Sequence, residues 1–368
     1  MTYSFLNAKF AEMTNEDDMT TYQSTNSDFT ELEGQKPRMS IHAVLGFAMS
    51  IASVAALSPI FVVRFSCVTC FSIPLIAILA TVLNLSALAT IKRSEGRLRG
   101  KYMAMSGITI AVVYIISLSS IFCVFAFREI REVRQRAQLS DIDVALELFN
   151  SQFGGYPPSD AMDEYGLPYC SAMKLCEALM GRDLKGFHPS SRFKRDGTDD
   201  SGTHLYDSNT LEIRKGPYIP TETAHAYRLR DLYKNIGPFD GNEYVLCDVY
   251  KNVKHIGTRK RVGMPILYYK ANTSRTAHDI NDPDNPENIY DYKDNHALIG
   301  LGVPGKPGQK HPLYENPRIF YEMTRDYNVA KMSKPQRADT FILLSAGKDG
   351  LYGTKDDIAN FEIGWKPK

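Results

Sequence analysis

Three long stretches of this chain contain no Asp, Glu, Lys or Arg, and they constrain its fold more than any other feature. They cover residues 39–63, 65–91 and 103–127, and each is more than 20 residues long. A helix needs roughly 20 apolar residues to cross a hydrocarbon core of about 30 Å. One such run is also typical of the core helix of a soluble protein, but three in succession indicate a membrane protein. We therefore expect three transmembrane helices and a lipid bilayer as a partner.

The basic residues between the second and third runs predict the orientation in the membrane. Residues 92–101 contain five Lys or Arg and one Glu, whereas the first connection carries only Arg64. An excess of Lys and Arg stays on the cytoplasmic side. We therefore expect a bacterial inner-membrane protein with a cytoplasmic N-terminus and a periplasmic C-terminal domain. The net charge of the whole chain is only +1, so nucleic acid is not an expected partner.

The chain is expected to divide into four regions. Its first residues are polar and acidic and lack apolar periodicity, which predicts disorder. The third apolar run continues without Pro until Gly154-Gly155, which predicts one long helix. The regions are a disordered cytoplasmic tail (1–36), a membrane module with two transmembrane helices and a basic loop (37–102), a third transmembrane helix continuing as a long helix (103–153), and a periplasmic globular domain (154–368).

The second half of the long helix is expected to be amphipathic. Apolar residues recur there at steps of three to five, close to the period of one helix face. This face is expected to pack against the globular domain. Its residues are Ile130, Val133, Ala137, Ile142, Ala145, Phe149 and Phe153.

The region after the long helix has the pattern of an α+β domain with long irregular insertions. Strands are predicted at 244–250, 265–270 and 340–345, where β-branched and aromatic residues concentrate. A short helix is predicted at 169–181, and 278–313 is predicted to be loop because Asp, Asn and Pro are frequent there. The expected fold is therefore three transmembrane helices, the third running on into a long helix packed on a small antiparallel sheet.

An acidic, glycine-rich segment near the C-terminus is the candidate metal site. SAGKDGLYGTKDDIANF, residues 345–361, contains Asp349, Asp356 and Asp357 together with three glycines. Ca²⁺ takes six to eight oxygen ligands from carboxylates and backbone carbonyls, and glycines allow the tight turns that such a loop requires. The alternative is an Asp-Gly hairpin turn whose acids are solvated.

Four segments, in order, resemble the major pseudopilin of type II secretion systems. They are ALELFNSQFGGYPPS (145–159), GPYIP (216–220), GMPILYYKAN (263–272) and the acidic segment at 345–361, which is the most similar. The resemblance implies a type IV pilin-like fold, and it implies that Asp349, Asp356 and Asp357 bind Ca²⁺ as a structural ion. It further implies partners among the proteins of a secretion or pilus-type apparatus.

The membrane region departs from that family. A pilin-like precursor places its membrane helix directly after a leader peptide, with Gly at the cleavage point and Glu five residues into the mature helix. Here two apolar runs precede residues 103–127, which contain no Glu. Processing by a prepilin peptidase is therefore not expected. The segment GRLRGKYMAMSG (96–107) resembles part of a small uncharacterised bacterial membrane module, which implies no chemistry.

Two classes of function follow. The first is a membrane-anchored structural or interaction protein with a calcium-ordered loop. The alternative is a periplasmic ligand-binding or sensing module on a pilin-like scaffold. An aromatic pocket built from the insertion at 160–340, including the Tyr-rich segments at 218–233 and 289–292, would favour that alternative. A compact insertion wrapped around the long helix, with a flat exposed surface, would favour the structural role.

No catalytic motif indicates an enzyme. The histidines lack metal-ligand spacing, and there is no nucleophile elbow or Gly-rich phosphate loop. The acidic segment 278–295 is predicted to be a solvated loop, although Asp282, Asp284 and Asp291 offer a second cation site as the alternative. Three cysteines lie in the expected periplasmic domain. The residues Cys170, Cys176 and Cys247 are either free thiols or contain one disulfide to Cys247.

Overall fold

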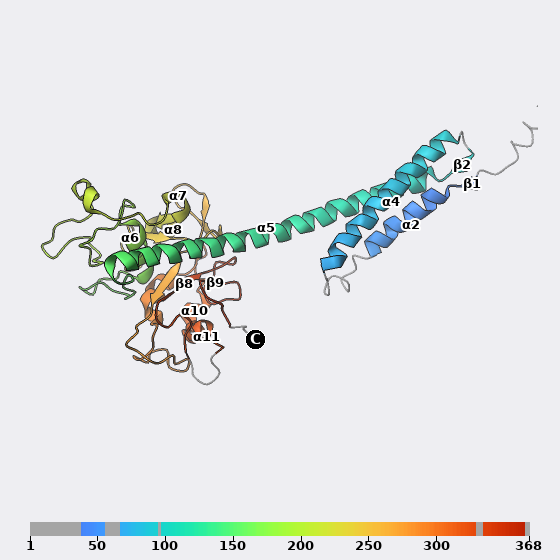
Figure 1. Ribbon diagram of the computed structural model, residues 1–368. Coiled ribbons are helices and arrows are strands. Elements are labelled where there is room, and N and C mark those ends of the chain that lie inside the picture. Colours follow the sequence, from blue (N-terminus) through green and yellow to red (C-terminus); the bar gives the residue numbers. More distant parts are fainter. Residues whose placement is uncertain (1–37, 56–66, 95–96, 329–333, 365–368) are drawn as a thin grey trace, which may run out of the picture. The chain divides into compact units, whose positions relative to one another are not determined.

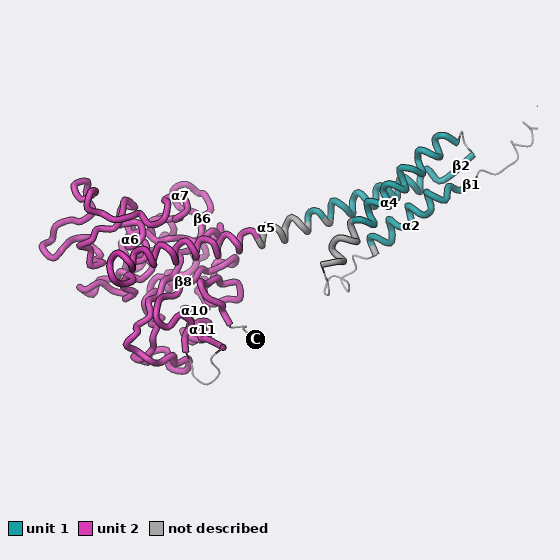
Figure 2. The backbone as a smooth tube through the Cα atoms, in the orientation of Figure 1, with its two compact units in different colours: residues 1–125 teal, residues 126–368 magenta. Residues whose placement is uncertain are grey.

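The computed structural model describes residues 38–55, 67–94, 97–328 and 334–364. The predicted tail at 1–36 lies outside these residues. The chain forms two compact units, residues 1–125 (unit 1) and residues 126–368 (unit 2), shown in Figure 2. Helices and small sheets occur together, so the α+β class expected from the sequence is confirmed.

Unit 1 is built from helices and one short strand pair (Figure 1). Its helices are α2 (Ile41–Ala55), α4 (Cys67–Arg93) and the first part of α5 (Lys101–Phe153). Strand β1 (Arg38–Met39) pairs in parallel with β2 (Leu98–Arg99). This pair ties the residues before α2 to the residues before α5.

Among the side chains that the structure describes, the interior of unit 1 contains mainly small ones. On each helix the buried positions recur at steps of three and four, which is the spacing of helices packed in left-handed bundles. Gly, Ala and Ser let helix backbones approach closely. The buried positions are Ala43, Gly46, Ser50 and Ser53 on α2, Ala77, Ala80, Asn84 and Ala87 on α4, and Ala104, Gly107, Ala111 and Tyr114 on α5.

The large apolar side chains of unit 1 point outward instead. Ile41 is 73% exposed, and the exposed set also includes Leu75, Leu85, Val113 and Ile116. A water-soluble helix shows the opposite arrangement, with its apolar stripe inside and polar residues outside. The distribution in unit 1 is the one that helices surrounded by lipid require.

Asn84 is a buried amide among the small side chains of this interior. Its side chain is fully buried and donates to the hydroxyl of Ser50 in α2 at 3.3 Å. A Cβ atom at Gly46 or at Gly107 would come within 2.6 Å of the Asn84 amide. Glycine at both positions therefore provides the space for Asn84, so that this residue contacts both α2 and α5.

Within the described part of the chain, the helices long enough to span a membrane are fewer than the three predicted. Among the described residues, only Leu75–Arg93 is both long and apolar enough by length and composition. Ile41–Val54 and Lys101–Ser117 are shorter apolar helices. The first predicted run continues into residues 56–66, which lie outside the described residues. The third predicted run, 103–127, lies within α5 and also includes residues whose side chains are outside the described set.

Unit 2 contains the rest of α5 and several small sheets. The largest sheet is antiparallel, in the order β7 (Leu267–Lys270), β8 (Phe341–Ser345) and β9 (Ile358–Ala359). Two further antiparallel pairs join β3 (Ala226–Arg228) to β4 (Tyr244–Leu246) and β5 (Val253–Lys254) to β6 (Arg261–Val262).

One ten-residue helix and several shorter ones complete unit 2. Helix α6 (Ser171–Met180) is buried along its whole length and ends at Gly181, whose φ of 80° favours glycine. The helix predicted at 169–181 is therefore confirmed. The short helices are η1 (Ser208–Ile213), α7 (Thr221–Ala224), α8 (Leu229–Leu232), η2 (Tyr292–Asn295), α9 (His296–Ile299), α10 (Pro312–Glu315) and α11 (Arg318–Thr324).

The buried face of α5 in unit 2 differs from the predicted one. Val133 is 65% exposed, and Ile130 is also exposed, so the first part of the predicted apolar face was wrong. Gln138 is buried instead and donates to the carbonyl of Cys247 at 2.9 Å. Gln135 accepts from the N–H of Val249 at 2.9 Å. These glutamine amides pair with the backbone that follows β4, which explains why polar residues occupy the buried side.

The predicted strands exist but are shorter, and the predicted loop contains helices. The strand expected at 244–250 ends at Leu246, and residues 278–313 include η2, α9 and the first residues of α10. Four-residue helices leave too short a pattern to reveal a helical period. Cys170, Cys176 and Cys247 are buried free thiols, so the predicted alternative without a disulfide applies.

Candidate functional site: an acidic loop between two strands

The acidic segment forms the connection between β8 and β9. These strands are antiparallel neighbours, with Ser345 opposite Ile358, so the loop is closed at its base. Gly347, Gly350 and Gly353 all have positive φ values, from 62° to 90°. A Cβ atom at Gly347 would lie 2.0 Å from the carbonyl oxygen of Asp356. Glycine is therefore required where the two arms of the loop cross.

The structure brings the three predicted acidic residues close together: the carboxylates of Asp356 and Asp357 lie beside Thr354, and Asp349 joins them through its backbone N–H. Asp356 Oδ2 accepts from the N–H of Asp349 at 2.8 Å, and Asp356 Oδ1 accepts from the Thr354 hydroxyl at 2.7 Å. The same hydroxyl lies 3.5 Å from Asp357 Oδ1. Asp357 Oδ2 accepts from the N–H of Gly353 at 2.7 Å. Asp357 is buried, Asp356 is half-buried and Asp349 is exposed, so the solvated-turn alternative from the sequence agrees with the position of Asp349.

The charges in this loop are not balanced by basic side chains. Lys348 and Lys355 are in the loop itself, yet within the described part of the chain no ion pair reaches Asp349, Asp356 or Asp357. Three carboxylates close together in one loop repel one another unless a proton or a cation neutralises part of their charge.

The pKa values of Asp349 and Asp357 reflect this repulsion. Burial raises the pKa of Asp357 well above its usual range, and the negative charges of Asp356 and Asp349 raise it further. Burial also raises the pKa of Asp349, and the charge of Asp356 adds to the increase, while the N–H of Leu351 opposes it. Both groups therefore hold protons more tightly than free carboxyls when no cation is bound.

Side chains from other parts of unit 2 fix the loop. The buried ring of Tyr352 places its hydroxyl against the carbonyl of Pro265, and its N–H donates to His311 Nδ1 at 3.2 Å. Asn252 Nδ2 donates to the carbonyl of Gly347 at 3.0 Å. At the base, the Ser345 hydroxyl donates to the buried carboxylate of Asp248 at 2.9 Å. The loop is therefore pre-positioned by the core around it.

The donor set suits Ca²⁺ better than a softer metal. Asp349, Asp356, Asp357 and Thr354 offer only oxygen atoms, which Ca²⁺ prefers, whereas zinc takes Cys and His. Among the residues that the structure describes, no group of three or more His, Cys, Asp or Glu side chains is already arranged for a metal ion. Asp356 uses both oxygens for internal hydrogen bonds, and each oxygen keeps a further lone pair. Ion binding would therefore require the side chains to turn within the loop.

The second acidic segment has a different organisation. Asp284 forms an ion pair with Lys293 at 2.7 Å, and Asp291 accepts from the backbone N–H of Lys293 at 2.9 Å. Asp282 accepts from the N–H of Asp284 at 3.2 Å. These carboxylates satisfy turns and one lysine, and they do not converge on a common point. Asp282 and Asp284 are exposed, as the predicted solvated loop requires, but the end of the segment forms η2 and its Asp294 is buried.

A buried carboxylate that the sequence did not indicate lies elsewhere in unit 2. Glu177 of α6 is buried and accepts hydrogen bonds from Tyr169 at 2.5 Å, Ser191 at 2.6 Å and Tyr206 at 2.7 Å. Arg182 lies 3.8 Å away. The partners are far apart in the sequence, so no sequence motif indicates the cluster.

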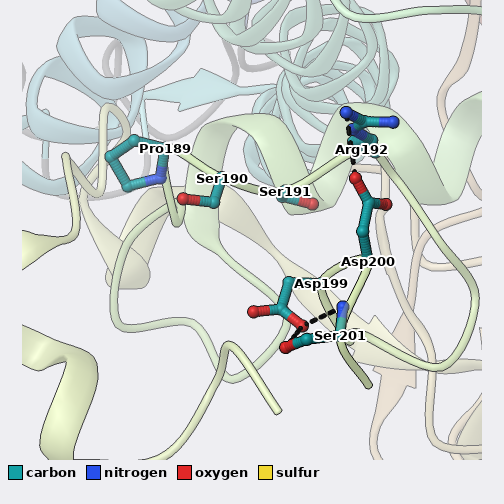
Figure 3. Close-up of a pocket in the computed structure, with 7 residues that line it drawn as sticks. All are labelled: Pro189, Ser190, Ser191, Arg192, Asp199, Asp200 and Ser201. Carbon is teal, nitrogen blue, oxygen red and sulfur yellow. Dashed lines mark hydrogen bonds and ion pairs between the residues drawn. The ribbon is translucent and has the colours of Figure 1, made fainter. Parts of the chain in front are cut away.

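A depression of about 480 Å³ opens beside this cluster (Figure 3). Figure 3 shows Arg192 turned toward Asp200, and Ser201 turned toward Asp199. Asp200 is paired with Arg192 at 3.0 Å and with Lys194 at 2.8 Å. The polar groups therefore satisfy one another. No aromatic side chain is among the residues that line this depression. The lining residues are Pro189, Ser190, Ser191, Arg192, Asp199, Asp200 and Ser201.

Comparisons with family models, curated proteins and solved structures found no match to this chain. The pseudopilin resemblance therefore depends on the four sequence segments alone. The site described above is characterised by its own geometry, which brings together three acidic residues on a loop closed by a strand pair.

Proposed function

We propose that this chain is a membrane-anchored, pseudopilin-like structural or interaction protein whose C-terminal loop is ordered by Ca²⁺. The observation that carries the proposal is the loop between β8 and β9, where Asp349, Asp356 and Asp357 lie close together without a basic partner among the described residues. A divalent cation would remove their repulsion and stabilise the folded loop. The ion would act on stability, and the surface of unit 2 would serve contacts with other proteins.

The proposed anchor is a set of three transmembrane helices in the bacterial inner membrane. Support comes from unit 1, where small residues fill the interior and large apolar residues cover the outside. Without a hydrophobic driving force between helices, such bundles depend on close backbone contact and a few polar pairs. The Asn84–Ser50 hydrogen bond is a pair of this kind.

The pilin-like character of unit 2 is part of the same proposal. Helix α5 continues as one helix of 53 residues from the apolar region into unit 2 and ends before Gly154-Gly155. A small antiparallel sheet follows, and the acidic loop lies at its edge strand β9. The proposed partners are proteins of a secretion or pilus-type assembly on the periplasmic side.

Calorimetric titration tests the calcium proposal directly. Purified full-length protein in detergent, stripped with a chelator, is expected to bind one Ca²⁺ per chain. Substitution of Asp349 and Asp357 together by Asn should abolish this binding. Absence of a heat signal with the unaltered protein, at protein concentrations well above the expected Kd, would contradict the proposal. Retained binding in the double variant would place the ion elsewhere.

A further inference from the structure

Unit 1 carries a concentrated positive surface at one end of its apolar helices. Strands β1 and β2 bring together three segments of the chain, namely the residues before α2, the end of α4 and the start of α5. All six basic side chains there are exposed. We call this group the basic cluster, and its members are Arg38, Lys92, Arg93, Arg97, Arg99 and Lys101.

The backbone under the basic cluster is held by hydrogen bonds. Arg38 donates its N–H to the carbonyl of Arg97 at 3.2 Å, and Ser40 donates to the carbonyl of Arg99 at 3.0 Å. The hydroxyl of Ser94 accepts from the N–H of Leu98 at 3.3 Å. The positions from which the cations project are therefore fixed relative to one another within unit 1.

The charges of the cluster are not compensated within the described residues. Within the described ranges, no ion pair includes any of its six members, and Glu95 lies outside those ranges. Lys92 and Arg93 are in the last turn of α4, where a cation is favourable. Lys101 is the first residue of α5, where a cation is unfavourable. Helix stability alone therefore does not account for the cluster.

Exposed apolar side chains lie immediately next to the cluster. Tyr102 is 86% exposed, and Met39 and Ile41 are exposed as well. A surface that changes within one or two residues from apolar to strongly basic matches the boundary between acyl chains and headgroups. A tyrosine at that boundary is typical of membrane interfaces.

We propose that the basic cluster binds the phosphate groups of anionic phospholipids in the leaflet that surrounds this end of unit 1. The inference depends on the proposed membrane anchorage and adds a lipid preference to it. Each Lys or Arg near an anionic surface strengthens binding about fivefold. Several fixed cations together therefore select acidic over zwitterionic headgroups.

Lipid retention tests this proposal on the full-length protein. The chain is reconstituted in bilayers of equal parts phosphatidylcholine and phosphatidylglycerol, extracted in mild detergent, and its retained lipid is quantified by mass spectrometry. We expect phosphatidylglycerol to be enriched about fivefold or more. The variant with Arg97→Gln, Arg99→Gln and Lys101→Gln keeps three of the six cations and should show a clearly smaller enrichment than the unaltered protein. Equal retention by the unaltered protein would overturn the inference.

A matched control removes the same number of charges elsewhere. Lys254→Gln, Lys260→Gln and Arg261→Gln alter three exposed cations on the β5–β6 hairpin of unit 2. This variant should keep the phosphatidylglycerol enrichment. If the enrichment is lost, the lipid preference comes from the net charge of the protein and not from the basic cluster. Inorganic phosphate added at the same concentration as the lipid phosphate should leave the enrichment unchanged. Displacement by free phosphate would instead indicate a soluble anion site.

A separate measurement distinguishes this inference from the membrane proposal. Protein in pure phosphatidylcholine vesicles is washed with alkaline carbonate. If it stays in the vesicles but shows no enrichment in the mixed bilayers, only the lipid preference fails. If it leaves the vesicles, the membrane anchorage fails and the lipid preference fails with it.

Discussion

The backbone N–H of Asp349 donates to Oδ2 of Asp356 at 2.8 Å, so acidic residues from the two arms of one loop are held against each other. Asp357 follows directly and turns its carboxylate inward to the N–H of Gly353. The folded loop thereby accumulates negative charge that the unfolded chain would disperse. Conditions that neutralise this charge are expected to stabilise unit 2.

Calcium should raise the thermal unfolding midpoint of the full-length protein. A ligand at a hundredfold excess over its Kd stabilises by about 2.7 kcal/mol, which corresponds to roughly 5–10 °C for a unit of this size. Asp357→Asn keeps an acceptor for the Gly353 N–H but removes a buried charge. We expect this variant to lose the calcium effect and to be at least as stable as the unaltered protein in chelator.

Asp141→Asn is the control for that measurement. Asp141 is exposed on α5, and its substitution should leave the calcium-dependent shift intact. An unfolding midpoint that is the same in calcium and in chelator for the unaltered protein would show that the loop binds no ion under these conditions.

Acid should weaken calcium binding. The pKa values of Asp349 and Asp357 are raised, chiefly by burial, so protons compete with the ion above the pH at which ordinary carboxyls ionise. Calcium affinity measured at about pH 5 should therefore be lower than at about pH 7.5. In chelator, the stability of the folded loop has the opposite pH dependence. A raised carboxyl pKa makes the folded loop less stable as pH rises. Calcium affinity that does not change between these pH values would contradict the assignment of these two carboxylates as ligands.

Asp248→Asn should reduce the loss of stability at higher pH. Burial raises the pKa of Asp248 to about 8, although the Ser345 hydroxyl and two backbone N–H groups oppose this increase. The folded state therefore binds one more proton than the unfolded state between the ordinary carboxyl pKa and about 8. Its stability falls there by up to about 1.4 kcal/mol per pH unit. Urea unfolding across that range should show a shallower slope in the variant.

A residual slope is expected in that experiment. Burial also raises the pKa of Glu243 to about 8, so its contribution remains when Asp248 is replaced. Glu243→Gln in the same background should flatten the profile further. An unchanged slope in both variants would mean that neither carboxyl takes up a proton on folding.

Leu85→Arg should impair membrane insertion. Leu85 is 53% exposed on α4, inside the one described stretch that is long and apolar enough to cross a membrane. An arginine near the centre of a membrane helix costs about 2.5–3.5 kcal/mol. Leu148, which is 52% exposed on α5 in unit 2, gives a matched control, and Leu148→Arg should insert normally. Translation in the presence of membrane vesicles, followed by sedimentation, measures the insertion of both variants. Equal insertion would show that α4 does not lie in the lipid.

The long helix and the three main strands could be predicted because their signals are local and repeated. The sequence predicts helix from 103 to 153, and α5 covers Lys101–Phe153. Strands β7 and β8 lie inside the predicted segments at 265–270 and 340–345. Continuous apolar residues, the absence of Pro, and β-branched runs are sufficient for such elements.

Features that depend on distant partners could not be predicted. The buried position of Gln138 requires the carbonyl of Cys247, which is more than one hundred residues away in the chain. The cluster around Glu177 likewise depends on hydroxyls from separate loops. By contrast, the convergence of Asp349, Asp356 and Asp357 could be anticipated, since all three lie within nine residues and glycines control the turns between them.

The small-residue interior of unit 1 determines which substitutions this part of the chain tolerates. Exchange of one large aliphatic residue for another on the outside alters only contacts with fluid surroundings. A single added methyl at Gly46 or Gly107, however, meets the Asn84 amide within 2.6 Å. Over evolutionary time the exterior should therefore drift freely among Leu, Ile and Val. In this part of the chain, the smallest residues should be the ones that change least among related proteins.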